Sequence, residues 1–166
     1  MLTWHQTRNG LAVTGLGDQA LWELPMTAFF ASRQCPGTAI RAAMDWALQQ
    51  ARARAVVVSG FHSPLKQSVL KVLIEARSPV VTVLARPVDG ARLSPEWAEP
   101  VAQGRMVVST AVATARLTNA IAAERNDHVA QLASSIVVAH ISPGGSLSAQ
   151  CERWRQAGRP VNVLSN

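Results

Sequence analysis

Six short apolar runs, separated by stretches with helical periodicity, constrain the fold of this chain more than any other feature. The runs are 26–31, 55–58, 79–85, 105–109, 135–141 and 160–164. Most are rich in β-branched residues and bounded by Gly, Pro or Ser, which is typical of strands. Because most are apolar at consecutive rather than alternating positions, they resemble strands buried on both faces of a parallel sheet.

The stretches between the runs carry apolar residues at helical spacing. Such spacing predicts helices over 37–53, 64–77 and 145–157, and Ser94-Pro95-Glu96 predicts the start of a short extra one. Ser63-Pro64 supplies a capping hydroxyl and a first-turn proline, whereas Gly158-Arg159-Pro160 ends a helix. Alternating strands and helices predict an α/β, Rossmann-like fold: a single doubly wound, mostly parallel sheet of about six strands with helices on both faces.

The length of 166 residues fits one domain over 1–166, since domains hold roughly 100–200 residues. Residues 1–24 are less regular than the rest. They are expected to form an N-terminal strap or short helix that packs on the sheet through Leu21, Trp22 and Leu24.

The composition excludes several classes of protein. A hydrophobic content of 48% with 16% charged residues is that of a folded chain, not a disordered one. No apolar run approaches the roughly 20 residues of a membrane span, and the N-terminus lacks the apolar core of a secretory signal. Two cysteines make no disulfide framework, and Cys151 falls on an apolar helical stripe as a buried thiol. A cytoplasmic protein with no membrane partner is therefore expected.

The formal net charge is +6, and nearly all the cations are arginines. Arginine makes forked contacts with phosphate, so this bias fits an anionic partner. A GC-rich genome, which writes arginine in place of lysine, would produce the same bias. Charge alone leaves both explanations open.

Three turns that follow predicted strands are small, polar or rich in glycine. In open parallel sheets, ligands bind outside the carboxyl ends of the strands, and the helix that follows each turn offers backbone N–H groups to an anion. Any turn between a strand and a helix favours Gly, Ser and Pro, so a single such turn indicates little. Together they give these candidate ligand-binding residues: Ser32, Arg33, Ser59, Gly60, Phe61, His62, Ser63, Pro143, Gly144, Gly145 and Ser146.

Arg125 interrupts the apolar stripe of the helix before the fifth run, which continues through Val129 and Leu132. An inward-facing guanidinium needs an anion or other acceptors, because an unpaired buried charge is costly. Arg125 and the adjacent Asn126 are therefore candidates for ligand contact. The alternative is an internal salt bridge, with Glu124, Asp127 or Asp89 as the partner.

Motifs of several enzyme classes are missing from the sequence. It has no G-x-x-x-x-G-K-[ST] phosphate loop, no G-x-S-x-G nucleophile turn and no G-x-G-x-x-G after the first strand. Nor does any His, Cys or Asp spacing indicate a metal site. We therefore predict no catalytic residue, no cofactor and no metal, while His62 is either a ligand contact or a solvated loop histidine.

The order of the motifs resembles the Rossmann-type domain of the DprA/Smf DNA-processing proteins. FFASR at 29–33, VVVSGFHS at 56–63 and the segment 124–147, with its Arg-Asn pair and Pro-Gly-Gly-Ser turn, carry the resemblance. The wider superfamily includes the Lonely Guy and lysine-decarboxylase-like nucleotide-binding proteins. The resemblance implies a basic pocket that grips phosphates of a nucleotide or nucleic acid, formed by residues of the three turns together with Arg125 and Asn126.

Two departures from the family pattern bear on activity. Asp127 stands where the family has a second arginine, and an acid in the pocket would weaken contact with phosphate by repulsion. Enzymatic relatives carry Pro-Gly-Gly-x-Gly-Thr-x-x-Glu, but here Cys151 occupies the position of the glutamate. Glu152 is one residue late, about 100° around the helix. The resemblance therefore favours binding over catalysis.

Three functions remain as hypotheses. The first is non-catalytic binding of single-stranded nucleic acid through the basic pocket. The second is binding of a small nucleotide or a nucleotide-derived signal, and the least favoured is a nucleoside-monophosphate phosphoribohydrolase. The apolar edge helices are compatible with a homodimer.

Overall fold

A computed structural model of the chain describes residues 3–88, 92–111 and 119–164. Its centre is one eight-stranded sheet with the order β1-β2-β6-β5-β4-β3-β7-β8. Neighbouring strands from β6 to β8 all pair in parallel, and their apolar residues are buried on both faces in the four central strands. The six predicted strands are confirmed as β3 (Met26–Phe30), β4 (Val56–Ser59), β5 (Val80–Val83), β6 (Met106–Thr110), β7 (Ser135–Val138) and β8 (Val161–Val163).

The strand count of about six is wrong, because the N-terminal residues form two further strands. β1 (Thr3–Arg8) and β2 (Leu11–Leu16) make an antiparallel hairpin, and β2 pairs antiparallel with β6. The two residues between them, Asn9 and Gly10, both have positive φ, at 51° and 80°. This is the chemistry of a type I′ hairpin turn, which Asn-Gly favours.

The expected short helix follows as α1 (Gln19–Trp22), capped by the Asp18 carboxylate, which accepts a hydrogen bond from the Ala20 N–H. Leu21 and Trp22 are buried as expected, whereas Leu24 is 47% exposed and does not pack on the sheet. The hairpin, not Leu24, occupies the sheet edge.

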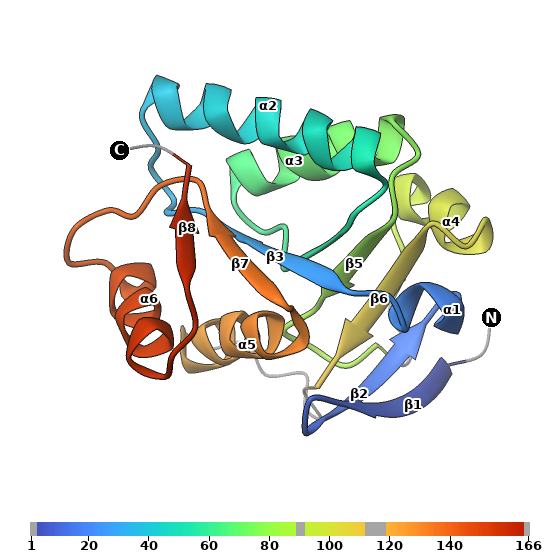
Figure 1. Ribbon diagram of the computed structural model, residues 1–166. Coiled ribbons are helices and arrows are strands. Elements are labelled where there is room, and N and C mark those ends of the chain that lie inside the picture. The colour runs from blue at the N-terminus through green and yellow to red at the C-terminus, as the bar shows by residue number, and fades with distance from the viewer. Residues whose placement is uncertain (1–2, 89–91, 112–118, 165–166) are drawn as a thin grey trace.

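Helices cover both faces of the sheet, as a doubly wound fold requires (Figure 1). The helices α2 (Gly37–Ala53), α3 (Pro64–Glu75) and α4 (Pro95–Ala102) pack on one face, in a cluster that includes Trp46, Leu73 and Val101. On the other face, α5 (Asn119–Leu132) and α6 (Ser146–Gln156) join α1 in a second cluster that includes Trp22 and Trp154. None of the helices in the described ranges combines the length and apolarity needed to cross a bilayer.

The strand order reverses beside β3. From β3 the chain proceeds outward through β4, β5 and β6, and α5 then brings it back to β7 on the opposite side of β3. Such a reversal leaves a crevice outside the carboxyl ends of the strands, where ligands of doubly wound sheets bind. The three candidate turns follow β4, β3 and β7, which are adjacent strands, so the fold brings the turns to one edge.

Candidate anion-binding site

The turns after β3 and β7 are joined by hydrogen bonds. Ser32 N–H donates to the carbonyl of His140 at 3.0 Å, and Ser142 N–H donates to Ser32 Oγ at 2.8 Å. The Ser142 hydroxyl reaches the carbonyl of Gln34 at 3.4 Å. The Ser32 side chain therefore links the two turns, while the neighbouring Arg33 is exposed.

Hydrogen bonds of a buried serine side chain stabilise the turn after β4. The buried Ser59 hydroxyl donates to the carbonyl of Phe29 at 2.8 Å and accepts from the Phe61 N–H at 3.3 Å. Phe61 has φ 49°, a left-handed conformation that is rare for a bulky residue, and its side chain is 3% exposed. The side chains of Ser59 and Phe61 therefore shape the turn from the protein interior, and a strained backbone residue of this kind is often found at functional sites.

Arg125 lies directly against this turn at Gly60. A Cβ atom added to Gly60 would lie 2.5 Å from Arg125 Nε, so the guanidinium approaches the backbone through the space that the missing side chain leaves. Arg125 is 5% exposed, and its Nε is buried with no hydrogen-bond partner among the residues that the structure describes. Burial lowers the pKa of Arg125 from its ordinary value. A buried donor without an acceptor is costly, which indicates that an external acceptor belongs here.

The carboxylates nearest in sequence do not neutralise Arg125. Glu124 is paired with His128, at 3.6 Å between Oε1 and Nε2. Asp127 accepts from Trp154 Nε1 at 3.0 Å and from Arg153 at 3.3 Å. Asp89, the third candidate, lies outside the described residues. The expected repulsion from Asp127 is thus relieved, because its carboxylate is engaged by α6.

Lys66, in the first turn of α3, is a second buried cation that sequence reasoning missed. It is 5% exposed, and its Nζ lies 5.7 Å from the centroid of the Phe30 ring. Burial and then the charge of Arg125 lower the pKa of Lys66 to about 8. No ion pair or hydrogen bond to Lys66 is found within the described part of the chain. A lysine at a helix N-terminus, where the dipole opposes it, was the available signal for an anion site.

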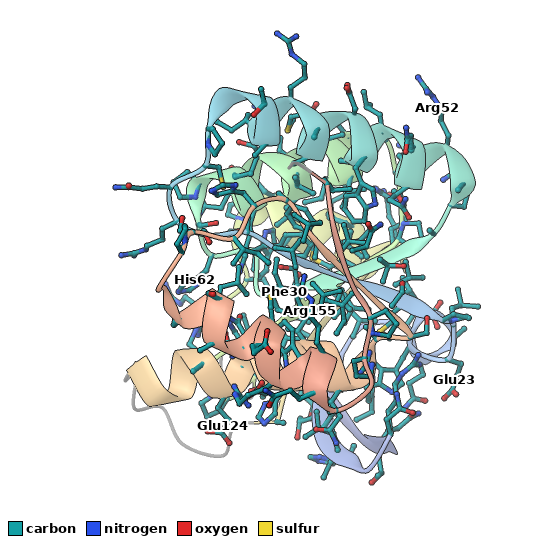
Figure 2. All side chains as sticks on the ribbon, turned by 60° about the vertical axis from the view of Figure 1, so that its left-hand side comes forward. Glu23, Phe30, Arg52, His62, Glu124 and Arg155 are labelled. Atoms are coloured by element: carbon teal, nitrogen blue, oxygen red, sulfur yellow. The ribbon has the colours of Figure 1, made fainter. Side chains whose placement is uncertain are left out.

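Two further side chains, His62 and Arg33, belong to the same electrostatic neighbourhood. Burial lowers the pKa of His62, and the charges of Arg125, Lys66 and Arg33 lower it further. Arg125, Lys66 and Arg33 therefore each lie within electrostatic range of His62, and we call these four side chains the cationic edge. In Figure 2, which turns this edge forward, Phe30 and His62 lie between the two helix layers.

The remaining predicted residues differ in their roles. Asn126 Nδ2 donates to Gln150 Oε1 at 3.1 Å, and Gln150 in turn donates to the carbonyl of Ala123 at 2.9 Å, so Asn126 ties α5 to α6. The Oδ1 of Asn126, like the hydroxyl of Ser63, is buried and has no hydrogen-bond partner within the described ranges. The expected capping bond of Ser63 is not made.

The turn after β7 is open to solvent. Pro143, Gly144, Gly145 and Ser146 are all exposed, and Gly144 has φ 75° with no atom within 4 Å of an added Cβ. Gly145 is the N-cap of α6, so the free N–H groups of the first turn of this helix face the same edge.

The position that would carry a phosphoribohydrolase carboxylate is part of the core. Cys151 is 0% exposed, and the adjacent Glu152 is exposed on the outer side of α6. The described residues therefore supply no carboxylate from this turn of α6 to the cationic edge.

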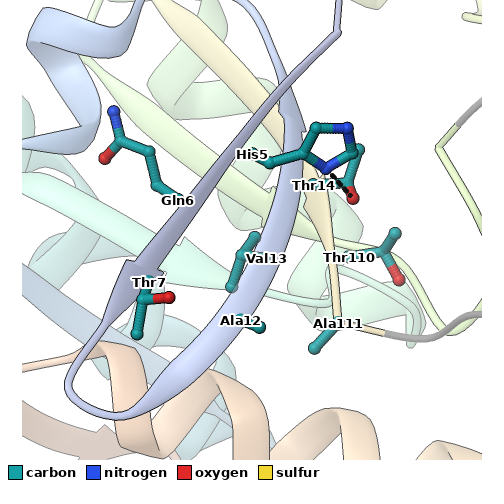
Figure 3. Close-up of a pocket in the computed structure, with 8 residues that line it drawn as sticks. All are labelled: His5, Gln6, Thr7, Ala12, Val13, Thr14, Thr110 and Ala111. Carbon is teal, nitrogen blue, oxygen red and sulfur yellow. Dashed lines mark hydrogen bonds between the residues drawn. The ribbon is translucent and has the colours of Figure 1, made fainter.

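A hollow of about 400 Å³ lies elsewhere, between the hairpin and the end of β6 (Figure 3). Its lining is neutral apart from His5, whose Nδ1 is 3.0 Å from Thr14 Oγ1. A hollow that is not lined by cations has no preference for phosphate. The cationic edge is therefore the better candidate for an anion-binding site.

Comparison with known proteins bears on the family and the fold of the chain. The model of the family "DNA recombination-mediator protein A" matches residues 6–165. DNA processing protein A from Streptococcus pneumoniae is similar in structure, with a TM-score of 0.74 and 18% identity over 92% of this chain and 54% of that chain. The chain thus spans about half the length of that protein. No curated protein matches the sequence.

Two further solved structures share the fold. DNA processing protein A from Helicobacter pylori, described with its mode of binding single-stranded DNA, has a TM-score of 0.79 and 14% identity over 99% of this chain and 80% of that chain. The molybdenum cofactor carrier protein of Chlamydomonas reinhardtii has a TM-score of 0.57 and 17% identity over 84% of this chain and 76% of that chain.

Proposed function

The chain belongs to the DNA recombination-mediator protein A family, and from this premise we propose that it binds single-stranded nucleic acid without catalysis, through phosphate contacts at the cationic edge. The observation that carries the proposal is the buried Nε of Arg125, which has no hydrogen-bond partner in the described part of the chain. Phosphate oxygens are the acceptors that a guanidinium fork matches best.

The burial of the two cations favours a single strand over a duplex. Lys66 and Arg125 are each 5% exposed, so a phosphate must approach the protein closely to reach them. The backbone of a single strand is flexible enough to do so, whereas a duplex holds its phosphates on a rigid cylinder. The Helicobacter pylori relative is described as binding single-stranded DNA, which supports the same choice of ligand.

A small nucleotide is the second candidate ligand. The molybdenum cofactor carrier proteins share this fold, and the charges of Arg125, Lys66 and Arg33 all act on one residue, His62, as a site for a single phosphate group requires. If this candidate is correct, a mononucleotide will raise the melting temperature of the protein while oligonucleotides compete poorly.

Binding of fluorescent oligonucleotides to an alanine variant tests the proposal. Arg125→Ala is expected to weaken binding by tenfold or more, because charge-assisted contacts are lost at the centre of the site. Its melting temperature should change little, since the residue makes no ion pair within the described part of the chain. Arg52→Ala is the matched control: it removes the same charge from the exposed last turn of α2. Normal binding by Arg125→Ala would show that the site is elsewhere.

A further inference from the structure

The charge balance of the cationic edge restricts the kind of phosphate that fits it. Lys66 and Arg125 are each 5% exposed, and the acids near Arg125 in sequence, Glu124 and Asp127, have other partners. Among the described residues, no carboxylate pairs with either cation. An anion from outside the protein would therefore offset the cost of burying these two positive charges.

The phosphate groups of nucleic acids differ in the charge they can supply. An internal phosphodiester carries one negative charge, whereas a phosphate monoester carries between about 1.5 and 2 negative charges at pH 7 and three terminal oxygens that accept hydrogen bonds. The monoester matches both cations at once. A single diester would leave one of them uncompensated in a poorly solvated place, which costs binding free energy.

The N-terminus of α3 offers a donor for the additional oxygens. Ser63, the N-cap residue of the helix that carries Lys66, has a buried hydroxyl with no hydrogen-bond partner among the described residues. Gly60 allows the guanidinium to lie against the backbone of the β4 turn, and a side chain there would displace it. Donors on two helices beside one turn suit a compact anion such as a single phosphate group.

We propose, building on the nucleic-acid binding proposed above, that the site formed by Lys66, Arg125 and the Ser63 hydroxyl binds a phosphate monoester dianion. Two sources supply this chemistry: the phosphorylated end of a single strand and a free nucleoside monophosphate. Lys66 is then the residue that distinguishes a monoester from a diester, because it supplies the second positive charge.

The test compares five probes at constant salt by fluorescence anisotropy and competition. They are a linear oligonucleotide with a 5′-phosphate, the same strand with a 3′-phosphate, the strand with hydroxyl ends, its circular form, and a nucleoside monophosphate. A terminally phosphorylated strand or the monophosphate is expected to bind about tenfold more tightly than a hydroxyl-ended or circular strand.

Two lysine variants on the same helix provide the matched comparison. Lys66→Met should abolish the tenfold preference for the monoester while leaving hydroxyl-ended strands less affected. Lys71→Met removes an identical charge from the exposed side of α3 and should retain the preference. Melting curves of both variants establish that they are folded.

The outcomes separate this inference from the proposed function. Equal binding of all strands, or a preference that survives in Lys66→Met, overturns the monoester site but leaves single-strand binding intact. Binding of the nucleoside monophosphate without any oligonucleotide overturns single-strand binding and supports the monoester site. If none of the five probes binds, both proposals are wrong.

Discussion

Gly60 and Arg125 form a contact that depends on the absence of a side chain. An added Cβ at Gly60 would lie 2.5 Å from Arg125 Nε and 2.9 Å from Cζ, which is closer than atoms pack. The contact positions a buried guanidinium that makes no ion pair within the described ranges. Holding this buried cation where a ligand can reach it therefore lowers the stability of the protein.

A glycine pair tests this contact. Gly60→Ala is expected to push the guanidinium out of place, weakening oligonucleotide binding about tenfold and destabilising the fold by about 1–3 kcal/mol through overpacking. Gly37→Ala is the control: an added Cβ at Gly37, the first residue of α2, meets no atom within 4 Å. It should bind normally and lose no stability. Binding titrations and urea denaturation measure both effects, and unchanged binding by Gly60→Ala would contradict the assigned contact.

Lys66 couples stability to pH. Burial and the charge of Arg125 lower its pKa from 10.5 to about 8 in the folded protein. Between these two values the unfolded chain binds the proton more strongly, so the free energy of unfolding rises as the pH increases from about 8 to 10.5. Below pH 8 the folded protein bears the full cost of a charged, buried lysine.

Replacing Lys66 should therefore stabilise the protein. Lys66→Met is expected to raise the free energy of unfolding at pH 7 by up to about 3 kcal/mol, given 1.36 kcal/mol per pKa unit. The gain over wild type should shrink as the pH rises from 7 to 10. Urea denaturation at both pH values measures it, with the exposed Lys71→Met as the control. A variant less stable than wild type at pH 7 would show that Lys66 has an internal partner.

Among the secondary-structure elements, the β1–β2 hairpin depends on Trp4. Its indole covers Gly15, the residue opposite it in the register, where a side chain would overlap the ring. Trp4 Nε1 donates to the carbonyl of Gly17 at 2.9 Å, and the ring meets Trp22 edge-on at 5.3 Å between centroids. Trp4 thus joins the hairpin to α1 and the core.

Truncating this side chain should cost stability but not function. Trp4→Ala is expected to lower the free energy of unfolding by about 3 kcal/mol, as for other large aromatic deletions. Oligonucleotide affinity of the folded variant should remain that of wild type, because the hairpin contributes nothing to the cationic edge. Thr7→Ala, an exposed change on β1, serves as the control in denaturant titrations. A loss of affinity in Trp4→Ala would place the hairpin in the binding surface.

The parallel strands could be predicted from sequence because burial on both faces makes consecutive residues apolar. The hairpin was missed because β1 has a mostly polar sequence with Trp4 as its one apolar residue and resembles a loop, although Asn9-Gly10 is a strong turn signal. The inward position of Arg125 could be predicted because this residue interrupts an apolar helical stripe. The burial of Lys66 could not be predicted, because its surroundings, Phe30 and Arg125, come from distant parts of the chain. Its place at a helix N-terminus was the one signal that the sequence offered.

The roles of other site residues were also beyond sequence reasoning. The side chains of Ser59 and Asn126 could both bind a ligand. Instead, the Ser59 hydroxyl donates to the carbonyl of Phe29, and the Asn126 amide donates to Gln150 on α6. A polar side chain at a predicted site can bind a ligand or support the fold, and only the distances to its neighbours decide between these two roles.

For the molecule as a whole, a net charge of +6 attracts any polyanion, so affinity alone does not identify the cationic edge as the binding site. The number of phosphates that the site contacts is a more specific quantity. Each phosphate that a protein neutralises on a single strand contributes about −0.7 to the slope of log K against log salt concentration. Removing a cation that contacts phosphate changes the slope, whereas removing a distant one does not.

Salt titrations of three proteins therefore test the site at this scale. With about three phosphates contacted, wild type should show a slope near −2, so that affinity falls roughly 20-fold between 50 and 200 mM salt. Arg125→Ala should show a slope near −1.4, because one phosphate contact is lost. Arg52→Ala lowers the net charge by the same amount, but Arg52 lies in the last turn of α2, so this variant should keep the wild-type slope. If the net charge alone set the slope, the two variants would change it equally. Equal slopes in wild type and Arg125→Ala would mean that the strand passes over the protein without entering the crevice, and that the buried guanidinium has another purpose.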